Sequence, residues 1–155
     1  MSHLPNPALT PAERFSMALH ATAREWRIAI DKRLKDLGVG QSGWMTIAMI
    51  AKAKEPLSQR ALADLLGIEG PSIVSMLDRL ERDGLVRREP SPLDRRVKLA
   101  HLTDDGRALY AKVRREADAF RAAMLDGLDP ATLNAATDLL EGLRARIGAP
   151  PGEGL

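Results

Sequence analysis

The chain contains no cysteine among its 155 residues. Disulfides, thiolate nucleophiles, zinc–thiolate sites and thiol-based peroxide sensing are therefore excluded. Aromatic residues make up only 3% of the sequence, which argues against a single-strand binder that stacks bases on aromatic side chains. No apolar run is long enough to span a membrane, and residues 1–15 lack the basic-then-apolar profile of a secretory signal. We therefore expect a cytoplasmic protein with no membrane partner.

Nothing in the sequence marks an enzyme or a metal site. The histidines His3, His20 and His101 lie far apart. No serine stands in a nucleophile motif, and there is neither a glycine-rich phosphate loop nor an acidic metal cluster. We predict no catalytic residue, no metal and no cofactor.

The composition that is present, 45% hydrophobic and 28% charged, indicates one domain with a buried core. We place this domain at residues 10–147. Residues 1–9 and the Pro/Gly-rich residues 148–155 are expected to be loosely ordered tails. The net charge of +2 says little about partners, because a nucleic-acid footprint depends on where the charge lies.

Caps and apolar spacings predict a mainly helical fold. Thr10-Pro11-Ala12-Glu13 has the form of a capping box, so a helix is expected from there to about Leu37. A second helix is expected over about 41–52. Two more follow later in the chain, over about 103–125 and 129–147.

Residues 57–83 predict two short helices around a tight turn. Ser58 is placed to cap the first helix, which ends at Gly67. Residues 67–70 form a turn of the size that joins a helix-turn-helix, and Pro71 is tolerated in the first turn of the second helix. That second helix, expected to run to about Asp83, is named the recognition helix.

Residues 85–88 and 97–102 are β-like segments around a Pro-Ser-Pro-Leu-Asp loop, and they predict a hairpin, named the wing. The predicted fold is therefore mainly α, with six helices and a small β-hairpin: a winged helix-turn-helix. Between Leu85 and Leu99 five basic residues stand against two acidic ones, a local charge of +3. The basic residues are Arg87, Arg88, Arg95, Arg96 and Lys98.

The recognition helix has a polar face suited to DNA. Ser72, Ser75 and Arg79 are spaced three and four apart, so they share a face that large apolar side chains do not block. The major groove of B-DNA admits such a helix. A merely solvated face is the alternative, but the capped helix before it and the basic wing after it favour DNA. Gln59 and Arg60, in the first turn of the supporting helix, are placed to hold a phosphate.

Three motifs carry a family resemblance. GIEGPSIVSMLDRLERDGLV at 67–86, DRR at 94–96 and LTDDG at 102–106 resemble MarR-family winged helix-turn-helix regulators, and within them the SlyA-type branch. The helix around Trp44 and the segment AREWRIAIDKRL at 23–34 extend the likeness. The resemblance implies a DNA-binding lobe over about 41–103 and dimerisation helices over about 10–37 and 104–147. It also implies a homodimer that sets two recognition helices on a pseudo-palindromic site.

The resemblance also implies roles for single residues. Ser72 and Ser75 would meet base edges or phosphates, and Arg96 would enter the minor groove with Asp94 orienting its guanidinium. The sequence departs from the pattern at Ser75, where SlyA-type members commonly carry arginine, and at Leu99, where a basic residue is usual. The full predicted DNA-binding set is Ser58, Gln59, Arg60, Pro71, Ser72, Ser75, Arg79, Asp94, Arg95 and Arg96.

A small-molecule effector is a further expectation from the resemblance, because many relatives bind aromatic carboxylates or phenols between the dimerisation helices and the DNA-binding lobe. The matching positions are Arg24, Arg27, Ser42, Trp44 and Ala48. Arginine with tryptophan could hold a carboxylate and a ring. The alternative is that Trp44 packs in the core while the arginines pair with acids such as Asp31 across the dimer.

These observations predict a sequence-specific regulator that binds double-stranded DNA as a homodimer. We expect a repressor, with a small aromatic or phenolic ligand as the candidate for relieving repression. The alternative is a winged-helix protein-interaction module without direct DNA readout.

Overall fold

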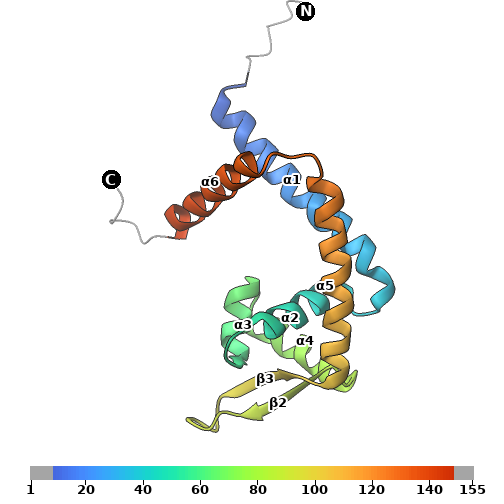
Figure 1. The fold of residues 1–155 in the computed structure, drawn as a ribbon. Coiled ribbons are helices and arrows are strands. Elements are labelled where there is room, and N and C mark those ends of the chain that lie inside the picture. The colour runs from blue at the N-terminus through green and yellow to red at the C-terminus, as the bar shows by residue number, and fades with distance from the viewer. Residues whose placement is uncertain (1–8, 149–155) are drawn as a thin grey trace, which may run out of the picture. The chain divides into compact units, whose positions relative to one another are not determined.

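The computed structural model describes residues 9–148 (Figure 1). The predicted tails, 1–9 and 148–155, lie outside the described residues except for Leu9 and Gly148. The described elements, in chain order, are α1 (Pro11–Leu34), the 3₁₀ helix η1 (Lys35–Leu37), α2 (Gly40–Lys52), β1 (Leu57–Ser58), α3 (Gln59–Leu66), α4 (Gly70–Arg82), β2 (Val86–Pro90), β3 (Lys98–Leu102), α5 (Asp104–Leu125) and α6 (Pro130–Gly148). The predicted fold class, mainly α with a β-hairpin wing, is confirmed.

The chain divides into two compact units, with the boundary between Asp118 and Ala119 inside α5. The first unit contains α1 to α4 and all three described strands, and the second contains α6. Every candidate site residue lies in the first unit.

Local capping signals set the helix ends as the sequence predicts. At the start of α1 the Thr10 hydroxyl accepts a hydrogen bond from the Glu13 N–H at 3.2 Å, while the Thr10 N–H donates to Glu13 Oε2 at 2.8 Å. These two bonds satisfy helix-end N–H groups that have no partner inside the helix. The Thr10 hydroxyl also donates to Glu13 Oε2, at 2.8 Å. The bonds from the Thr10 backbone N–H and hydroxyl hold the pKa of the Glu13 carboxyl below its usual value, because both favour its charged form.

The turn between α3 and α4 depends on Gly67. Its φ of 64° lies in the left-handed region, which costs a side-chain-bearing residue energy but costs glycine little. The chain then enters α4, the recognition helix, with Glu69 at the N-cap and Pro71 in the first turn. The predicted helix-turn-helix is therefore confirmed in its elements and in its turn.

The sheet has three antiparallel strands in the order β1-β3-β2. In the wing, Arg88 stands opposite Ala100 and Val86 opposite Leu102. The short strand β1, with Leu57 opposite Ala100 on the other edge of β3, was not expected from the sequence. Two residues cannot display the alternation by which strands are recognised.

The core of the first unit lies where α2, α3 and α4 meet the sheet (Figure 1). Ile47, Leu62 and Leu77 are completely buried, one from each of the three helices. Val86 and Leu102, on the two wing strands, complete this core. Burial of α4 along Ile73, Leu77 and Leu80 fixes which face of the recognition helix stays outside.

Candidate nucleic-acid interface

The exposed face of α4 forms a shallow depression of about 420 Å³. Its lining is Pro71, Ser72, Ser75, Met76 and Arg79. The structure therefore brings together the four residues of this helix that the sequence assigned to DNA, and adds Met76. No described residue forms a hydrogen bond with the hydroxyl of Ser72 or of Ser75, so both hydroxyls remain available as donors and acceptors.

Arg79 is partly committed within the protein. Its Nη2 donates to the Val39 carbonyl oxygen at 3.1 Å and to Met76 Sδ at 3.3 Å. The first of these bonds ties the recognition helix to the residue before α2. Arg79 still lines the exposed depression, so its predicted DNA contact would use the guanidinium N–H groups left over from these bonds.

The first turn of α3 carries Ser58, Gln59 and Arg60. The Ser58 hydroxyl accepts a hydrogen bond from the Ala61 N–H at 3.1 Å, which confirms the predicted cap. Arg60 is exposed and no described residue pairs with it. Gln59 is half-buried because its side-chain oxygen accepts a hydrogen bond from Arg88.

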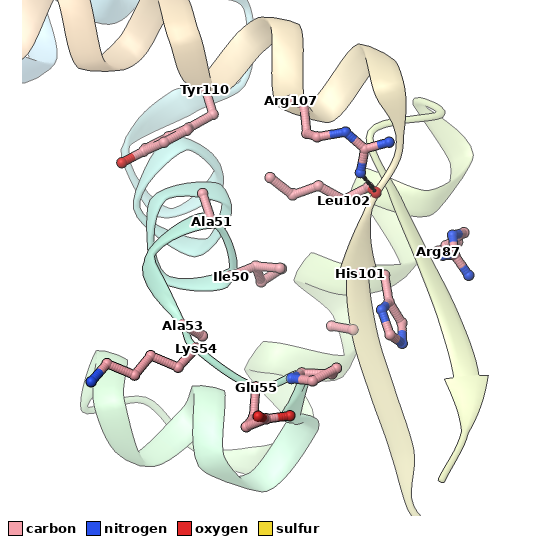
Figure 2. Close-up of a pocket in the computed structure, with 12 residues that line it drawn as sticks. Ile50, Ala51, Ala53, Lys54, Glu55, Arg87, His101, Leu102, Arg107 and Tyr110 are labelled. Atoms are coloured by element: carbon pink, nitrogen blue, oxygen red, sulfur yellow. Dashed lines mark hydrogen bonds between the residues drawn. The ribbon is translucent and has the colours of Figure 1, made fainter. Parts of the chain in front are cut away.

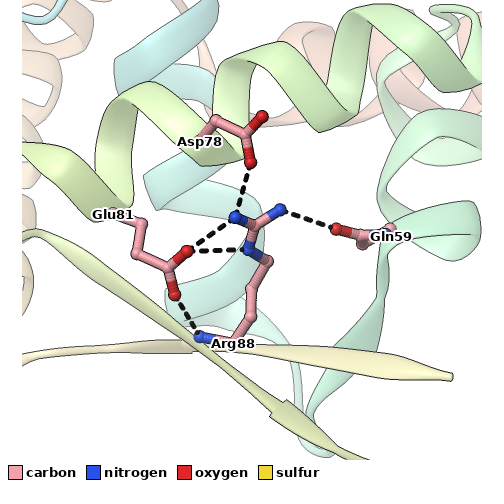
Figure 3. Close-up of polar contacts among 4 residues, drawn as sticks. All are labelled: Gln59, Asp78, Glu81 and Arg88. Atoms are coloured by element: carbon pink, nitrogen blue, oxygen red, sulfur yellow. Dashed lines mark hydrogen bonds and ion pairs between the residues drawn. The ribbon is translucent and has the colours of Figure 1, made fainter. Parts of the chain in front are cut away.

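Arg88 on β2 lies at the centre of a polar cluster (Figure 3). Its Nη2 contacts Asp78 Oδ1 at 2.5 Å and Glu81 Oε2 at 2.6 Å, while its Nε donates to the same Glu81 oxygen at 3.1 Å. Its Nη1 donates to Gln59 Oε1 at 3.1 Å, and its backbone N–H donates to Glu81 Oε1 at 3.0 Å. The Arg88 side chain is only 18% exposed. Arg88 belongs to the local charge of +3 counted from the sequence, but Asp78 and Glu81 neutralise it within the protein.

The pKa values of this cluster follow from the contacts. Hydrogen bonding from the Arg88 side chain holds the pKa of Glu81 below its usual value, against a smaller opposing effect of burial. The same hydrogen bond, with a further contribution from Asp78, raises the pKa of Arg88. Both groups are held in their charged forms.

The tip of the wing holds Asp94 and Arg96 together. Asp94 Oδ1 accepts from the Arg96 backbone N–H at 3.0 Å and from its Nε at 3.2 Å, and Oδ2 accepts from Nη2 at 3.2 Å. Hydrogen bonding from the Arg96 side chain, with help from its backbone N–H, lowers the pKa of Asp94. The Arg96 side chain is nevertheless 91% exposed. The carboxylate thus orients a guanidinium that remains open to solvent.

Other wing cations are also paired. Arg87 forms an ion pair with Glu89, and the ring of His101 lies 3.6 Å from the other Glu89 oxygen. Among the described residues, Arg95 and Lys98 are the wing cations for which no ion pair is found. Sequence counting missed this pairing because a local sum of charges does not show which carboxylates lie across a strand or on a neighbouring helix.

The five predicted effector residues are not brought into one site. Arg24 and Arg27 line a cavity of about 580 Å³ along α1 with His20, Asp31 and Gln41 among its other residues. Trp44 packs against the core and donates from Nε1 to Asp31 Oδ1 at 3.3 Å. Ala48 is buried, and Ser42 is exposed. Arg24 pairs with its neighbour Glu25 at 2.9 Å.

A second cavity of about 490 Å³ lies between the end of α2, β3 and the first turns of α5. Figure 2 shows Tyr110 of α5 over Ala51 of α2, Arg107 of α5 extending toward Leu102, and His101 on the β3 side. Arg107 is fixed in this wall because its Nη1 donates to the Leu102 carbonyl oxygen at 2.8 Å. This cavity could not be predicted from the sequence, since its walls come from segments far apart in the chain.

Residues 9–148 contain neither a cluster of metal ligands nor a membrane-spanning helix. No group of three or more potential metal ligands comes together in that range. None of the helices found there is both long and apolar enough to cross a membrane.

Comparison with known proteins decides the family. The family model described as MarR family matches residues 37–97. The crystal structure of the transcriptional regulator PA3341 is 34% identical to this chain with a TM-score of 0.80, and the match covers 86% of this chain and 97% of that one. The chain belongs to the MarR family.

Other MarR structures are similar over comparable lengths. CouR from Rhodococcus jostii RHA1, crystallised with p-coumaroyl-CoA, is 26% identical with a TM-score of 0.77, covering 88% of this chain and 95% of that chain. A MarR-family regulator from Listeria monocytogenes, crystallised with a 26mer DNA, is 24% identical with a TM-score of 0.76, covering 84% and 87%. Placement in the SlyA-type branch of the MarR family stays a prediction.

Two positions where this MarR chain departs from the SlyA-type pattern can now be placed. Ser75 lies inside the depression on α4. Leu99, on β3, stands opposite Ser58 of β1 and Glu89 of β2 and is half-buried. Leu99 therefore packs within the sheet, whereas Ser75 leaves open a space that a longer side chain would fill.

Proposed function

We propose that this protein is a sequence-specific regulator that binds double-stranded DNA as a homodimer and acts as a repressor. The observation that carries the proposal is the depression on α4, where Ser72 and Ser75 stand exposed with free hydroxyls. A groove-binding helix needs such a face, on which small polar side chains stand exposed. Met76 in the same lining is half-buried and accepts a hydrogen bond from Arg79. The DNA complex of the Listeria relative supports the same use of the fold.

The proposal gives the wing and α3 separate tasks. Arg96, extended from the wing tip and oriented by Asp94, would enter the minor groove, where its charge meets an enhanced negative potential. Arg60 and the Gln59 amide would hold a phosphate at the start of α3. These contacts carry little sequence information, so they position the recognition helix and leave readout to Ser72 and Ser75.

The homodimer is supported by apolar side chains left exposed on the terminal helices. Met17 and Ile28 on α1 and Leu139, Leu140 and Ile147 on α6 are each more than one-third exposed. Two copies would present two recognition helices to a pseudo-palindromic site.

Salt dependence of binding tests DNA recognition directly. We expect the logarithm of the affinity for duplex DNA to fall linearly with the logarithm of salt concentration, by roughly 0.9 per phosphate neutralised. The probe is duplex selected from a random pool by binding to the wild-type protein. A flat titration would contradict the proposal and favour the protein-interaction module instead.

Two substitutions separate positioning from readout. Arg96→Ala should weaken binding to all sequences and reduce the salt slope by about one per half-site. Ser72→Ala should change which sequences are selected and leave the slope as it is. Wild-type binding by both variants would show that the assigned surface is wrong.

We also propose a small aromatic carboxylate or phenol as effector, supported by the CouR complex with p-coumaroyl-CoA and by the cavity that contains Arg24 and Arg27. A ligand that binds the folded protein raises its melting temperature. Phenolic carboxylates should therefore stabilise the protein and release DNA in parallel. Stabilisation without release would mean that binding is not coupled to regulation.

Matched variants distinguish the two cavities. Loss of stabilisation in Arg24→Gln and Arg27→Gln but not in Lys54→Gln would place the ligand along α1. The reverse result would place it between α2, β3 and α5, where Lys54 lines the wall.

A further inference from the structure

We propose that Arg88 is a positioning residue for DNA recognition, whose guanidinium fixes the recognition helix to the wing and to the first turn of α3. The inference rests on the proposed function, since it concerns how the DNA-contacting elements are held. Arg88 itself would touch no DNA.

All three side-chain nitrogens of Arg88 form hydrogen bonds within the protein. Its Nε, Nη1 and Nη2 each donate to an acceptor of this chain, on Glu81, Gln59 and Asp78 respectively (Figure 3). The planar fork of arginine suits such a set of acceptors, which lysine cannot match with a single ammonium group. With two carboxylates against its one charge, the guanidinium is fully neutralised. A phosphate would have to displace these partners before it could bind.

The partners lie where they control the orientation of α4. Asp78 follows Ser75 by three residues and Glu81 follows it by six, so both lie within two turns of the reading positions. Arg88 joins them to β2, whose backbone N–H also bonds to Glu81. Rotation of α4 about its axis would break these bonds. Core burial sets which face of α4 points outward, and the bonds of Arg88 hold the exact azimuth at which Ser72 and Ser75 face the groove.

A second effect concerns Gln59. An arginine N–H can bond only to an acceptor, so the amide oxygen of Gln59 must face Arg88. The amide nitrogen then points away, and no described residue accepts from it. Arg88 thereby presents the donor end of Gln59, which is the end that a phosphate needs.

Glu81→Gln makes the inference testable because two explanations predict opposite changes in DNA affinity. If these residues acted only through their charge, removing a carboxylate beside a polyanion would tighten DNA binding. If Arg88 and Glu81 position α4, losing the charged hydrogen bonds would weaken binding to the selected site.

The experiment compares Arg88→Lys, Glu81→Gln and the double variant in the full chain. Affinity is measured for the selected duplex and for a random duplex across a salt series. We expect each single variant to lose about tenfold on the selected duplex, and the double variant to lose no more than either single one. Affinity for random duplex should change by less than about twofold, with an unchanged salt slope.

Arg87→Lys is the matched control, because Arg87 precedes Arg88 on β2 and pairs with Glu89 instead. It should bind both duplexes as the wild type does. Thermal unfolding checks that every variant is folded at the assay temperature. If Arg88→Lys is not folded, Asp78→Asn replaces it, since that substitution leaves the Glu81 and Gln59 bonds intact.

Four results would overturn the inference: wild-type affinity in the folded Arg88 variant, tighter binding by Glu81→Gln, additive losses in the double variant, or a reduced salt slope in Arg88→Lys. The last would mean that Arg88 contacts phosphate. Absence of DNA binding by the wild type would be a failure of the proposed function, which the first titration detects separately.

Discussion

Gly106 is buried in the first turn of α5, where the backbone passes against Leu85. A Cβ built on Gly106 overlaps the Leu85 carbonyl oxygen and lies 3.4 Å from Leu102 Cβ. The overlap is with backbone, which cannot swing aside as a flexible side chain can. This one residue therefore allows α5 to start directly beside Leu85, in the turn between α4 and β2.

Gly106→Ala should lower the free energy of unfolding by roughly 1–3 kcal/mol, the usual cost of forcing an extra carbon into a packed site. Urea denaturation followed by circular dichroism measures the change. Gly70→Ala is the control, because a Cβ there meets nothing within 4 Å and no positive φ is required. Equal stability of the two variants would contradict the packing argument.

His101 on β3 shows a second effect of single-residue environment. Burial lowers the pKa of its ring, and the charge of Arg87 lowers it further. The pKa is lowered even though a Glu89 carboxylate oxygen lies 3.6 Å from the ring. The His101 ring therefore binds a proton more readily in the unfolded chain than in the folded one. The contribution of the neutral ring to the free energy of unfolding is complete above pH about 6.5 and is lost as the pH falls.

His101→Gln should flatten the dependence of the melting temperature on pH below about 6.5. The measurement is a series of thermal unfolding curves for wild type and variant across this range. His20→Gln, an exposed position on α1, serves as control. A variant whose melting temperature falls with acid as steeply as that of the wild type would rule out His101 as the source.

At the scale of elements, Thr103 joins the start of α5 to the turn between α4 and β2. Its hydroxyl donates to the Gly84 carbonyl oxygen at 2.6 Å and accepts from the Gly106 N–H at 3.0 Å. Its backbone N–H donates to the Leu85 carbonyl oxygen at 3.1 Å. The cap of one helix thus also fixes the entry to the wing.

Thr103→Val should cost about 1–2 kcal/mol of unfolding free energy, since it removes a helix cap and a second hydrogen bond while keeping the shape. Chemical denaturation checks this value. The same substitution at the exposed Thr22 in α1 should change stability by less than about half as much. Similar losses at both sites would mean that the exchange of a hydroxyl for a methyl group, rather than the loss of the cap, sets the effect.

Elements whose ends carry their own signals could be predicted from the sequence. Thr10 with Glu13, Ser58 and Gly67 each act on residues within one turn, and the structure contains all three features where the sequence placed them. The strand β1 could not be found in this way. Its pairing of Leu57 with Ala100 joins segments 43 positions apart and leaves no local pattern.

In the candidate site, too, local features could be predicted from the sequence and long-range contacts could not. Ser72, Ser75 and Arg79 share a helix face by spacing alone, and the depression on α4 contains all three. Long-range contacts were missed: Arg79 bonds to Val39, and Arg88 bonds to acceptors on α3 and α4. Sequence reasoning counts the charges of arginines correctly but cannot show which partners neutralise them.

At the scale of the whole molecule, the proposed dimer depends on apolar surface that the single chain leaves exposed. On α6 these residues include Leu139 and Leu140. Burial of such side chains between two copies would contribute roughly 1.5–3 kcal/mol for each one fully buried. Carboxylates in their place would have to be desolvated for the dimer to form.

The double variant Leu139→Glu with Leu140→Glu should therefore shift the molecular mass in sedimentation equilibrium from dimer to monomer. Leu93→Glu is the control, because Leu93 at the wing tip is 98% exposed and belongs to neither terminal helix. A wild-type protein that sediments as a monomer, or a double variant that remains dimeric, would contradict the proposed assembly.

The contacts of Arg88 divide the recognition helix into two parts with different freedom to change. Residues 71–75 have no bonds to the cluster, whereas Asp78 and Glu81 are tied through it to Gln59. New operator preferences could thus arise by substitution in the first part while the second keeps the helix in register. In a graft of another regulator's helix onto this scaffold, exchanging residues 71–75 alone should transfer specificity. A graft of the whole helix would have to bring partners for Arg88 with it.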